Sequence, residues 1–379
     1  MPPRIVIVVV TSILGLLHAY IGLRILPDLP LPALYEIFGV LWLLLSFVLI
    51  PLGLLSQAIK TQPLSDRLAW AGMLAMGFFS SLLVLTIFRD IALLLAALFK
   101  ISSVFLSGDT ALLVPLLALA VSLVGFINAR RVAAVRHVDV PISNLPAALH
   151  GFTIAQISDV HVGATIKRGY LEAIVNKVNR LKPDMIAVTG DLVDGSVARL
   201  HMQTAPLGNL SARHGAYFVT GNHEYYSNAD EWIAEIRRLG VTVLMNQHVL
   251  LRHDHATLLV AGVCDYGAHH FDESHRSDPQ AALKGAPSQI AVKILLAHQP
   301  RTAEAAASAG FDLQLSGHTH GGQFFPWNFF VPMQQPFTAG LHRLHALWVY
   351  TSRGAGYWGP PKRLWAPSEI ALLRLVPAQ

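Results

Sequence analysis

The sequence predicts an α/β fold class with two parts, an N-terminal region of four transmembrane helices and a domain of two stacked mixed β-sheets flanked by helices. Two observations indicate this architecture. The 379-residue chain is 53% apolar and only 13% charged, and its apolar excess lies before about Asn128, which is unusual for a soluble protein. After that point, short apolar runs alternate with amphipathic helical patterns, as expected where helices cover sheets.

The first part contains four apolar runs, at about residues 5–26, 34–55, 68–88 and 111–128. A helix of about 20 apolar residues crosses a hydrocarbon core roughly 30 Å thick. A cleaved signal peptide is not expected for the first run, because it lacks a convincing cleavage site and further apolar runs follow it. We therefore expect residues 1–128 to form a transmembrane region, residues 129–150 a linker and residues 151–379 one domain.

Basic residues beside these runs predict the orientation of a multi-pass protein in the cell membrane. With four spans, one side of the membrane carries Arg4, Lys60, Arg67, Arg130, Arg131 and Arg136, and the other carries Arg24, Arg89 and Lys100. The positive-inside rule then places the N-terminus and the large domain in the cytoplasm. This requires Ile91–Phe99 to extend the third helix or to form an interfacial turn, because a fifth span over Ile91–Leu106 would invert the topology.

The overall charge does not indicate a nucleic-acid partner. The formal charge is +5 and the isoelectric point is near 9.4, but the Lys and Arg residues are scattered and form no known binding motif. Attraction to anionic lipid headgroups explains the basic cluster after the last span more simply. Cys264 is the only cysteine, which excludes an intrachain disulfide and thiolate zinc clusters.

The second part alternates strands and helices. A helical repeat of apolar residues ends before Pro183, a second helix has Asn228 as its N-cap, and a short Ala-rich helix covers Arg301–Ser308. Short apolar runs predict strands over Phe152–Ser158, Met185–Thr189, Tyr217–Thr220, Val241–Met245, Val249–Arg252, Thr257–Val263, Val292–Ala297 and Leu313–Ser316. Helical crossovers early and adjacent strands later favour two mixed sheets with helices outside.

Five of these strands end in clusters of side chains that bind metals. The clusters are Asp159-Val160-His161, Gly190-Asp191-Leu192-Val193-Asp194, Gly221-Asn222-His223-Glu224, His298 and Gly317-His318-Thr319-His320. Ligands usually lie outside the carboxyl ends of strands in α/β sheets, so we expect one shared site. Imidazole and carboxylate donors suit Mn, Fe, Zn or Co.

The donors are too many for one ion, and two divalent ions about 3.5–4 Å apart, with one bridging carboxylate, would use them. Such a pair holds a hydroxide at neutral pH and clamps phosphate oxygens. The ligand set therefore predicts a metal-dependent hydrolase of phosphate esters or anhydrides.

In this order, the five blocks resemble the calcineurin-like metallophosphoesterase superfamily, from about Phe152 to the C-terminus. The N-terminal helices, Gly321-Gly322-Gln323 and the tail Pro361–Leu375 resemble its membrane-anchored bacterial branch. The resemblance implies a ligand set divided between two metals: Asp159, His161 and His320 for the first, Asn222, His298 and His318 for the second, and Asp191 bridging both.

The same resemblance implies that His223 is catalytic and is not a metal ligand. It would contact the substrate phosphate and assist the leaving group, with Asp194 or Glu224 as orienting or structural partners. Relatives of this kind include phosphodiesterases and diphosphatases of lipid-linked pyrophosphates. The identity of the scissile bond, as a monoester, a diester or a pyrophosphate, stays open.

Two further segments carry open alternatives. The aromatic run Phe324–Phe330 belongs either to the core or to an apolar lip on the bilayer. The pair His269-His270 either contacts substrate or lies in a solvated loop. We expect a membrane-bound dimetal phosphoesterase that acts on a phosphorylated substrate, lipid-linked or not, by metal-activated hydroxide attack. The alternative is a membrane transporter or sensor with a regulatory phosphoesterase-like domain.

Overall fold

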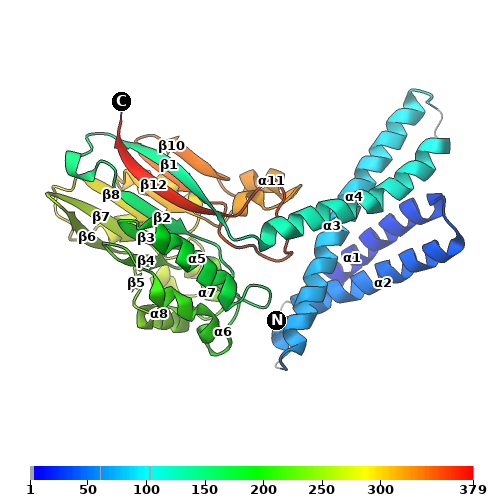
Figure 1. The fold of residues 1–379 in the computed structure, drawn as a ribbon, viewed down its shortest axis with the longest axis horizontal. Helices are drawn as coiled ribbons and strands as arrows, with labels where there is room; N and C mark the ends of the chain where they lie inside the picture. Colours follow the sequence, from blue (N-terminus) through cyan, green and yellow to red (C-terminus); the bar gives the residue numbers. More distant parts are fainter. Residues whose placement is uncertain (1–3, 60, 102–103, 379) are drawn as a thin grey trace. The chain divides into compact units, whose positions relative to one another are not determined.

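The computed structural model of the chain describes residues 4–59, 61–101 and 104–378. The chain folds into two compact units (Figure 1). The helical unit comprises residues 1–127 and 359–362, and the α/β unit comprises residues 128–358 and 363–379. Lys60 and the side chain of Arg4, which entered the charge count above, lie outside the described part.

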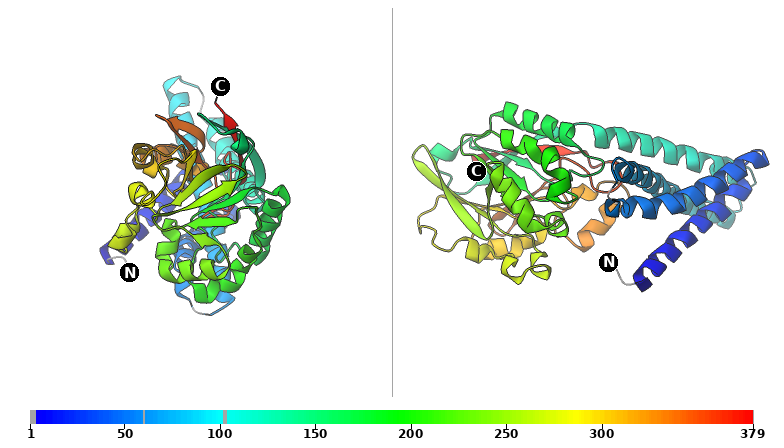
Figure 2. Two further views of the ribbon diagram at one scale, coloured as in Figure 1. Left: turned by 90° about the vertical axis from the view of Figure 1, so that its left-hand side faces the viewer. Right: turned by 90° about the horizontal axis from the view of Figure 1, so that it is seen from below.

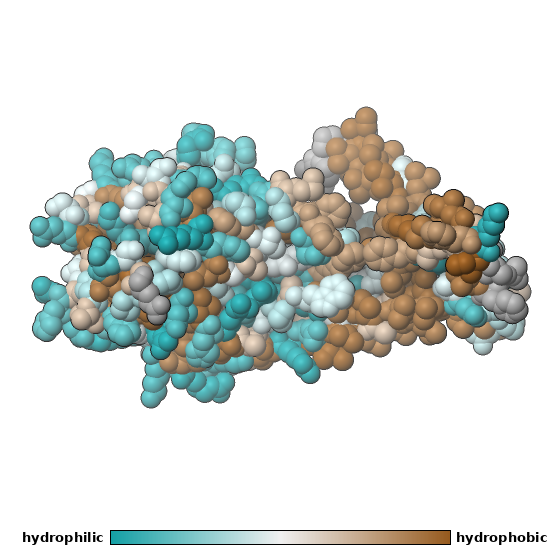
Figure 3. Space-filling view, turned by 90° about the horizontal axis from the view of Figure 1, so that it is seen from above, coloured by the Kyte–Doolittle hydropathy of each residue, from teal (hydrophilic) through white to brown (hydrophobic). Residues whose placement is uncertain are grey.

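The helical unit contains four helices that are long and apolar enough to cross a membrane. They are α1 (Arg4–Ile25), α2 (Ala33–Leu54), α3 (Leu64–Leu98) and α4 (Val104–Arg130). Figure 3 shows apolar residues over most of the face of these helices that the view presents, as expected of helices that face hydrocarbon. A helix is present at each of the four predicted spans, and Ile91–Leu98 extends the third helix.

Small residues bring α2 and α3 close together. A Cβ added to Gly53 would lie 2.7 Å from the Cα of Gly72, so the two backbones meet where neither residue has a side chain. His18 is buried between helices, with Nε2 3.2 Å from the Ser46 hydroxyl and Nδ1 2.8 Å from the Leu14 carbonyl. Both ring nitrogens have partners inside the helical unit, which favours a structural role for this residue.

Charged residues near one end of the helices are paired within the unit. Arg24 contacts Asp90 at 2.9 Å, and the buried Arg89 pairs with Asp28 and donates to the Arg24 carbonyl. Two of the three basic residues that count against the predicted orientation are therefore partly neutralised by carboxylates. The positive-inside rule counts Lys and Arg residues and gives carboxylates little weight, so this pairing leaves the predicted orientation unchanged.

The α/β unit contains two six-stranded mixed sheets. The first has the order β1-β12-β2-β3-β4-β5 and the second the order β10-β11-β9-β8-β7-β6. The strands are β1 (Ala134–Ile142), β2 (Thr153–Ile157), β3 (Met185–Thr189), β4 (Ala216–Val219), β5 (Thr242–Val243), β6 (Gln247–His253), β7 (Ala256–Gly262), β8 (Val292–Leu296), β9 (Leu313–Ser316), β10 (Gly340–Leu344), β11 (Leu347–Thr351) and β12 (Glu369–Pro377). The predicted fold class is confirmed.

Helices cover the outer faces of both sheets. They are α5 (Arg168–Leu181), α6 (Val197–Thr204), α7 (Asn222–Tyr226), α8 (Ala229–Arg238), α9 (Pro279–Ala282) and α10 (Ala303–Ser308). A further short helix, α11 (Trp327–Phe330), has no buried residue. Figure 2 shows the green helices gathered on one side of the strands. The predicted cap at Asn228 is present, since its side chain accepts a hydrogen bond from the Glu231 amide.

Alternating residues of each strand enter different cores. In β3, Ile186 packs with the helices of the first sheet, whereas Ala187 faces the second sheet. In β8, Ile294 lies between the sheets and Leu295 packs under α9 and α10. Because both faces of each sheet are buried, both sets of alternating residues are apolar, and the central strands are continuous apolar runs in the sequence.

The expected linker at residues 129–150 differs from the structure, because it contains β1, which pairs in parallel with β12 along the edge of the first sheet. Val138, Val140 and Ile142 alternate with polar residues there, and Pro141 is tolerated since an edge strand needs fewer ladder bonds. The last strand brings the C-terminal tail into the centre of the fold, between β1 and β2.

Candidate metal centre

The five ligand clusters lie at the carboxyl ends of parallel strands. In the first sheet, β2, β3 and β4 run parallel to one another. In the second sheet, β8 and β9 do the same. Each strand ends within a few residues of a candidate ligand, so the polypeptide delivers all seven candidates to one region between the two sheets.

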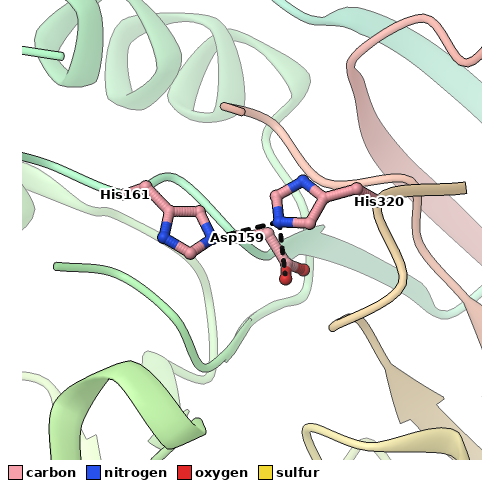
Figure 4. A group of neighbouring side chains, drawn as sticks. All are labelled: Asp159, His161 and His320. Atoms are coloured by element: carbon pink, nitrogen blue, oxygen red, sulfur yellow. Dashed lines mark hydrogen bonds and ion pairs between the residues drawn. The ribbon is translucent and has the colours of Figure 1, made fainter. Parts of the chain in front are cut away.

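One group of possible ligands contains Asp159, His161 and His320 (Figure 4). The Nε2 atoms of the two histidines lie 3.0 Å apart, and Nε2 of His320 lies 3.6 Å from Oδ1 of Asp159. All three side chains are buried. A second group contains Asp191, His298 and His318.

In the second group, Nε2 of His298 lies 3.1 Å from Oδ2 of Asp191 and 3.2 Å from Nδ1 of His318. The same Asp191 oxygen lies 3.9 Å from Nε2 of His161 in the first group. One carboxylate oxygen is therefore near both groups, which is the position a bridging ligand requires.

Backbone geometry holds these ligands in an uncommon conformation. Positive φ angles occur at five candidates: Asp159 (54°), His161 (56°), Asp191 (50°), His318 (71°) and His320 (51°). Such conformations are rare for residues other than glycine and often occur at functional sites. Gly317 permits the close approach of two loops, because a Cβ there would collide with Ser158 Oγ and Asp159 Oδ2.

The buried donors fit divalent metal ions. Oδ1 of Asn222 is buried and has no hydrogen-bond partner among the described residues. His298 Nδ1 lies 2.8 Å from the Thr189 carbonyl, and a proton donated there leaves Nε2 free to bind a metal. Buried imidazoles whose unprotonated nitrogens face one another and a carboxylate make a suitable nitrogen and oxygen ligand set.

Electrostatics favour the metal-binding protonation state at three of the candidates. They act in the other direction at two: burial raises the pKa of Asp159, and at His298 the charge of Asp191 outweighs burial and holds the pKa well above its usual value. Burial lowers the pKa of His318 to about 3 and holds the pKa of His320 well below its usual value. Burial opposes ionisation of Asp191, but the nearby His298 and His223 outweigh it and hold the pKa of this carboxyl well below its ordinary range. Neutral imidazoles and an ionised carboxylate are metal-binding forms.

His223 lies beside both groups and is held by a carboxylate. Its Nδ1 donates to Oδ1 of Asp194 at 2.6 Å, while His161 Nδ1 lies 3.1 Å from the same oxygen. Burial lowers the pKa of His223, yet Asp191 and Asp194 outweigh this effect and raise the pKa to about 9. Asp194 thus orients a candidate ligand and the candidate acid together.

Glu224 has a structural role in the described site. Its carboxylate accepts hydrogen bonds from the backbone amides of Gly221, Asp191 and Leu192 at 2.6, 3.0 and 2.8 Å. Burial, reinforced by the charge of Asp191, raises the pKa of Glu224 to about 7. The side chain thereby joins two loops that carry candidate ligands. Of the two carboxylates, Asp194 orients histidine rings and Glu224 supports the loops.

Arg363 is a residue that the sequence patterns did not indicate. It is fully buried, and its guanidinium contacts Nδ1 of His320 at 3.0 Å. It also donates to the carbonyls of His320, Arg353, Gly356 and Ala366. No local sequence pattern links Arg363 to the site, because it lies 43 residues after His320 in the chain. Only the tertiary fold brings the two residues together.

The remaining candidates lie outside the two ligand groups. His269 and His270 lie in a short 3₁₀ turn with their rings 4.0 Å apart and tilted by 41°. His270 is exposed, and neither residue contacts a candidate ligand among the described residues. In the aromatic segment, Phe324 is 5% exposed, whereas Trp327 and Phe329 are 54% and 64% exposed. The core alternative therefore holds for Phe324 only.

Similarity to known proteins identifies the class. A family model described as calcineurin-like phosphoesterase matches residues 152–322. An uncharacterized metallophosphoesterase of Campylobacter jejuni is 33% identical over 381 residues, which cover 97% of each chain. The chain therefore belongs to the metallophosphoesterase family, and its resemblance to the calcineurin-like superfamily is confirmed.

Two vertebrate relatives share the combination of parts. Proteins of Bos taurus and Danio rerio, each called a transmembrane protein with metallophosphoesterase domain, are 41% and 38% identical to the chain. The alignments cover 67% and 65% of this chain but only 60% and 58% of those proteins. The chain thus spans less than two thirds of the length of these relatives.

Proposed function

We propose that the protein is a membrane-bound dimetal phosphoesterase that hydrolyses a phosphate ester or pyrophosphate. The observation that carries this proposal is the convergence of two buried ligand groups on Asp191, with His223 beside them. Asp159, His161 and His320 would hold one divalent ion. Asn222, His298 and His318 would hold the other, and Asp191 would bridge them.

When bound, such a pair would lower the pKa of a water molecule and neutralise phosphate oxygens. Burial alone would lower the pKa of His223, but Asp191 and Asp194 outweigh it and raise the pKa to about 9, so the ring carries a proton on each nitrogen at neutral pH. Nδ1 donates its proton to Asp194, and Nε2 holds the second proton on the side of Asp191. In hydrolysis, a water molecule loses a proton to solvent, its oxygen forms a bond to phosphorus, and the bond from phosphorus to the leaving oxygen breaks. We assign to His223 the proton that this leaving oxygen takes up.

A hydrolysis screen tests the proposal. The purified full chain is assayed with Mn, Zn, Co or Mg against simple phosphate esters and lipid pyrophosphates. We expect metal-dependent release of phosphate or of a phosphomonoester, which a chelator abolishes. Absence of turnover with every metal would contradict the proposal. Solute flux that persists after loss of the metal ligands would favour a transporter instead.

A bilayer-borne substrate is consistent with the exposed aromatic surface of α11 and the turn after it, formed by Trp327, Phe329, Phe330 and Met333. Large apolar side chains gathered on a surface mark a site of interaction, and tryptophan favours the membrane interface. A substrate in the membrane would also give a reason for tethering the catalytic domain to spanning helices.

We also propose a cytoplasmic catalytic domain. The argument is the excess of basic residues on one side of the candidate spans. A reporter fused to the carboxyl terminus should be active only in the cytoplasm. Activity only on the outer side would show that the number of spans is odd or that the charge rule fails for this chain.

A further inference from the structure

Exposed aromatic rings surround the candidate acid, His223. The Tyr226 ring lies 5.2 Å from the His223 ring, and the Trp358 ring lies 5.8 Å from it, measured between centroids. Phe271 lies 5.7 Å from Tyr226 and extends the group. These three aromatic side chains are 64%, 52% and 56% exposed in that order. We call Tyr226, Trp358 and Phe271 the aromatic rim.

The rim is held by the same segments that carry the metal site. Tyr226 ends α7, the helix that begins with Asn222 and His223. Trp358 is fixed through its backbone, because its amide donates to Oε1 of Gln323 at 3.0 Å and its carbonyl accepts from Nε2 at 2.9 Å. Gln323 is 7% exposed and lies three residues after His320. The backbones of Tyr226 and Trp358 are therefore held beside the candidate site, while their rings face solvent.

A purely structural role does not explain this exposure. Aromatic side chains that stabilise a fold bury most of their surface, and the three rings leave more than half of theirs to solvent. Tyr226 and Trp358 contact the side chain that would protonate the leaving oxygen, and Phe271 packs against Tyr226. Whatever is attached to that oxygen must pass beside these rings.

We propose that the aromatic rim is a binding site for the apolar part of the leaving group, and that this leaving group is a lipid-type alcohol. The inference rests on the proposed role of His223 at the leaving oxygen. The helical unit supplies the argument for a lipid, since four candidate spans hold the enzyme at a bilayer. The exposed rings of α11 also follow closely in the chain after Gln323, the residue that anchors Trp358.

Binding of two phosphonates to the metal-loaded full chain tests the site without requiring turnover. Octylphosphonate should bind on the order of tenfold or more tightly than ethylphosphonate, because each buried methylene contributes about 0.8 kcal/mol. Trp358→Ala and Tyr226→Ala should each reduce this ratio severalfold, whereas Trp358→Phe should retain most of it. Trp365→Ala is the matched control: Trp365 is 79% exposed and makes no ring contact with His223, so the ratio should not change.

The outcomes separate this proposal from the proposed function. Equal affinities in the wild type, or a ratio that survives both alanine variants, would overturn the aromatic rim as an apolar subsite. Tighter binding of a nucleoside 5′-phosphonate than of octylphosphonate, lost in the same variants, would overturn the lipid assignment. Absence of turnover together with a rim-dependent preference for octylphosphonate would contradict the hydrolase and leave the binding site standing.

Discussion

The ligand loops and the α11 surface follow each other in the chain, yet the structure holds them in opposite ways. Around His320, side chains are buried, backbone φ angles are positive and hydrogen bonds fix each ring. A few residues later, Trp327 and Phe329 project into solvent. The difference teaches that the loops are organised by contacts inside the protein, whereas the α11 surface needs an external partner to bury its rings.

The largest expected effect lies in the loops. Asp191→Asn removes charge from the carboxylate shared by both ligand groups, so hydrolysis should fall by on the order of a thousandfold or more for every substrate. Metal content measured by mass spectrometry should also decrease. Asp139→Asn, which changes an exposed carboxylate paired with Arg374, is the control and should retain metal and rate. Two bound metals with a near-normal rate in Asp191→Asn would contradict the bridging assignment.

The second prediction tests whether His223 acts as a general acid or binds a metal. His223→Ala should keep both metals and lose about a hundredfold to ten-thousandfold in rate. The loss should be smaller for nitrophenol, which leaves without a proton, than for an alkyl alcohol. His201→Ala, at an exposed position on α6, should leave the rate unchanged. An equal loss for good and poor leaving groups would show that His223 does not protonate the leaving oxygen.

The third prediction concerns Arg363, which supports His320 from behind. Arg363→Met leaves four buried carbonyls without this donor, so unfolding should occur at lower temperature. A supporting contact of this kind typically contributes tenfold to a hundredfold, roughly, to metal affinity. We therefore expect loss of one of the two ions, with activity recovered at high metal concentration.

A purely structural role for Arg363 gives a different result. It would lower the melting temperature without weakening one ion more than the other. Metal titration of the folded variant, followed by calorimetry, separates the two cases. Arg343→Met, at an exposed position with its own backbone partner, provides the matched control for loss of a guanidinium.

Sequence reasoning succeeded where the signal is local. The strand over Met185–Thr189 and the cap at Asn228 were predicted from adjacent residues, and so were the four long apolar helices. It failed where the signal is tertiary. Arg363 and Trp358 reach the site from a connection after β11 that has no periodic pattern. β1 was missed because its three alternating apolar residues lie close to Pro141, which usually argues against a strand.

The candidate site shows the same difference between features that local sequence predicts and features that only the tertiary fold creates. The candidate ligands could be selected from short motifs, since each follows a strand within a few residues. The motifs did not separate the roles of Asp194 and Glu224, because both are carboxylates beside glycine turns. Only the fold reveals that Asp194 faces two imidazole rings while Glu224 faces three backbone amides.

The smallest effect on catalysis is expected from the α11 surface, and it should depend on how the substrate is presented. Replacing both Trp327 and Phe329 with Ser should leave hydrolysis of a small soluble ester near the wild-type rate, because neither ring is buried. Activity on a substrate embedded in vesicles should fall severalfold, since apolar area that enters the interface contributes roughly 25 cal/mol per Å².

Phe324→Ser is the informative contrast, because Phe324 is 5% exposed. Removing a buried aromatic ring costs about 3–5 kcal/mol, so stability and both activities should fall together. Thermal unfolding measured beside the two assays decides between these outcomes. A parallel loss of stability and of both activities in the Trp327 and Phe329 double variant would show that these rings support the fold, and the α11 surface would then no longer favour a lipid-borne substrate.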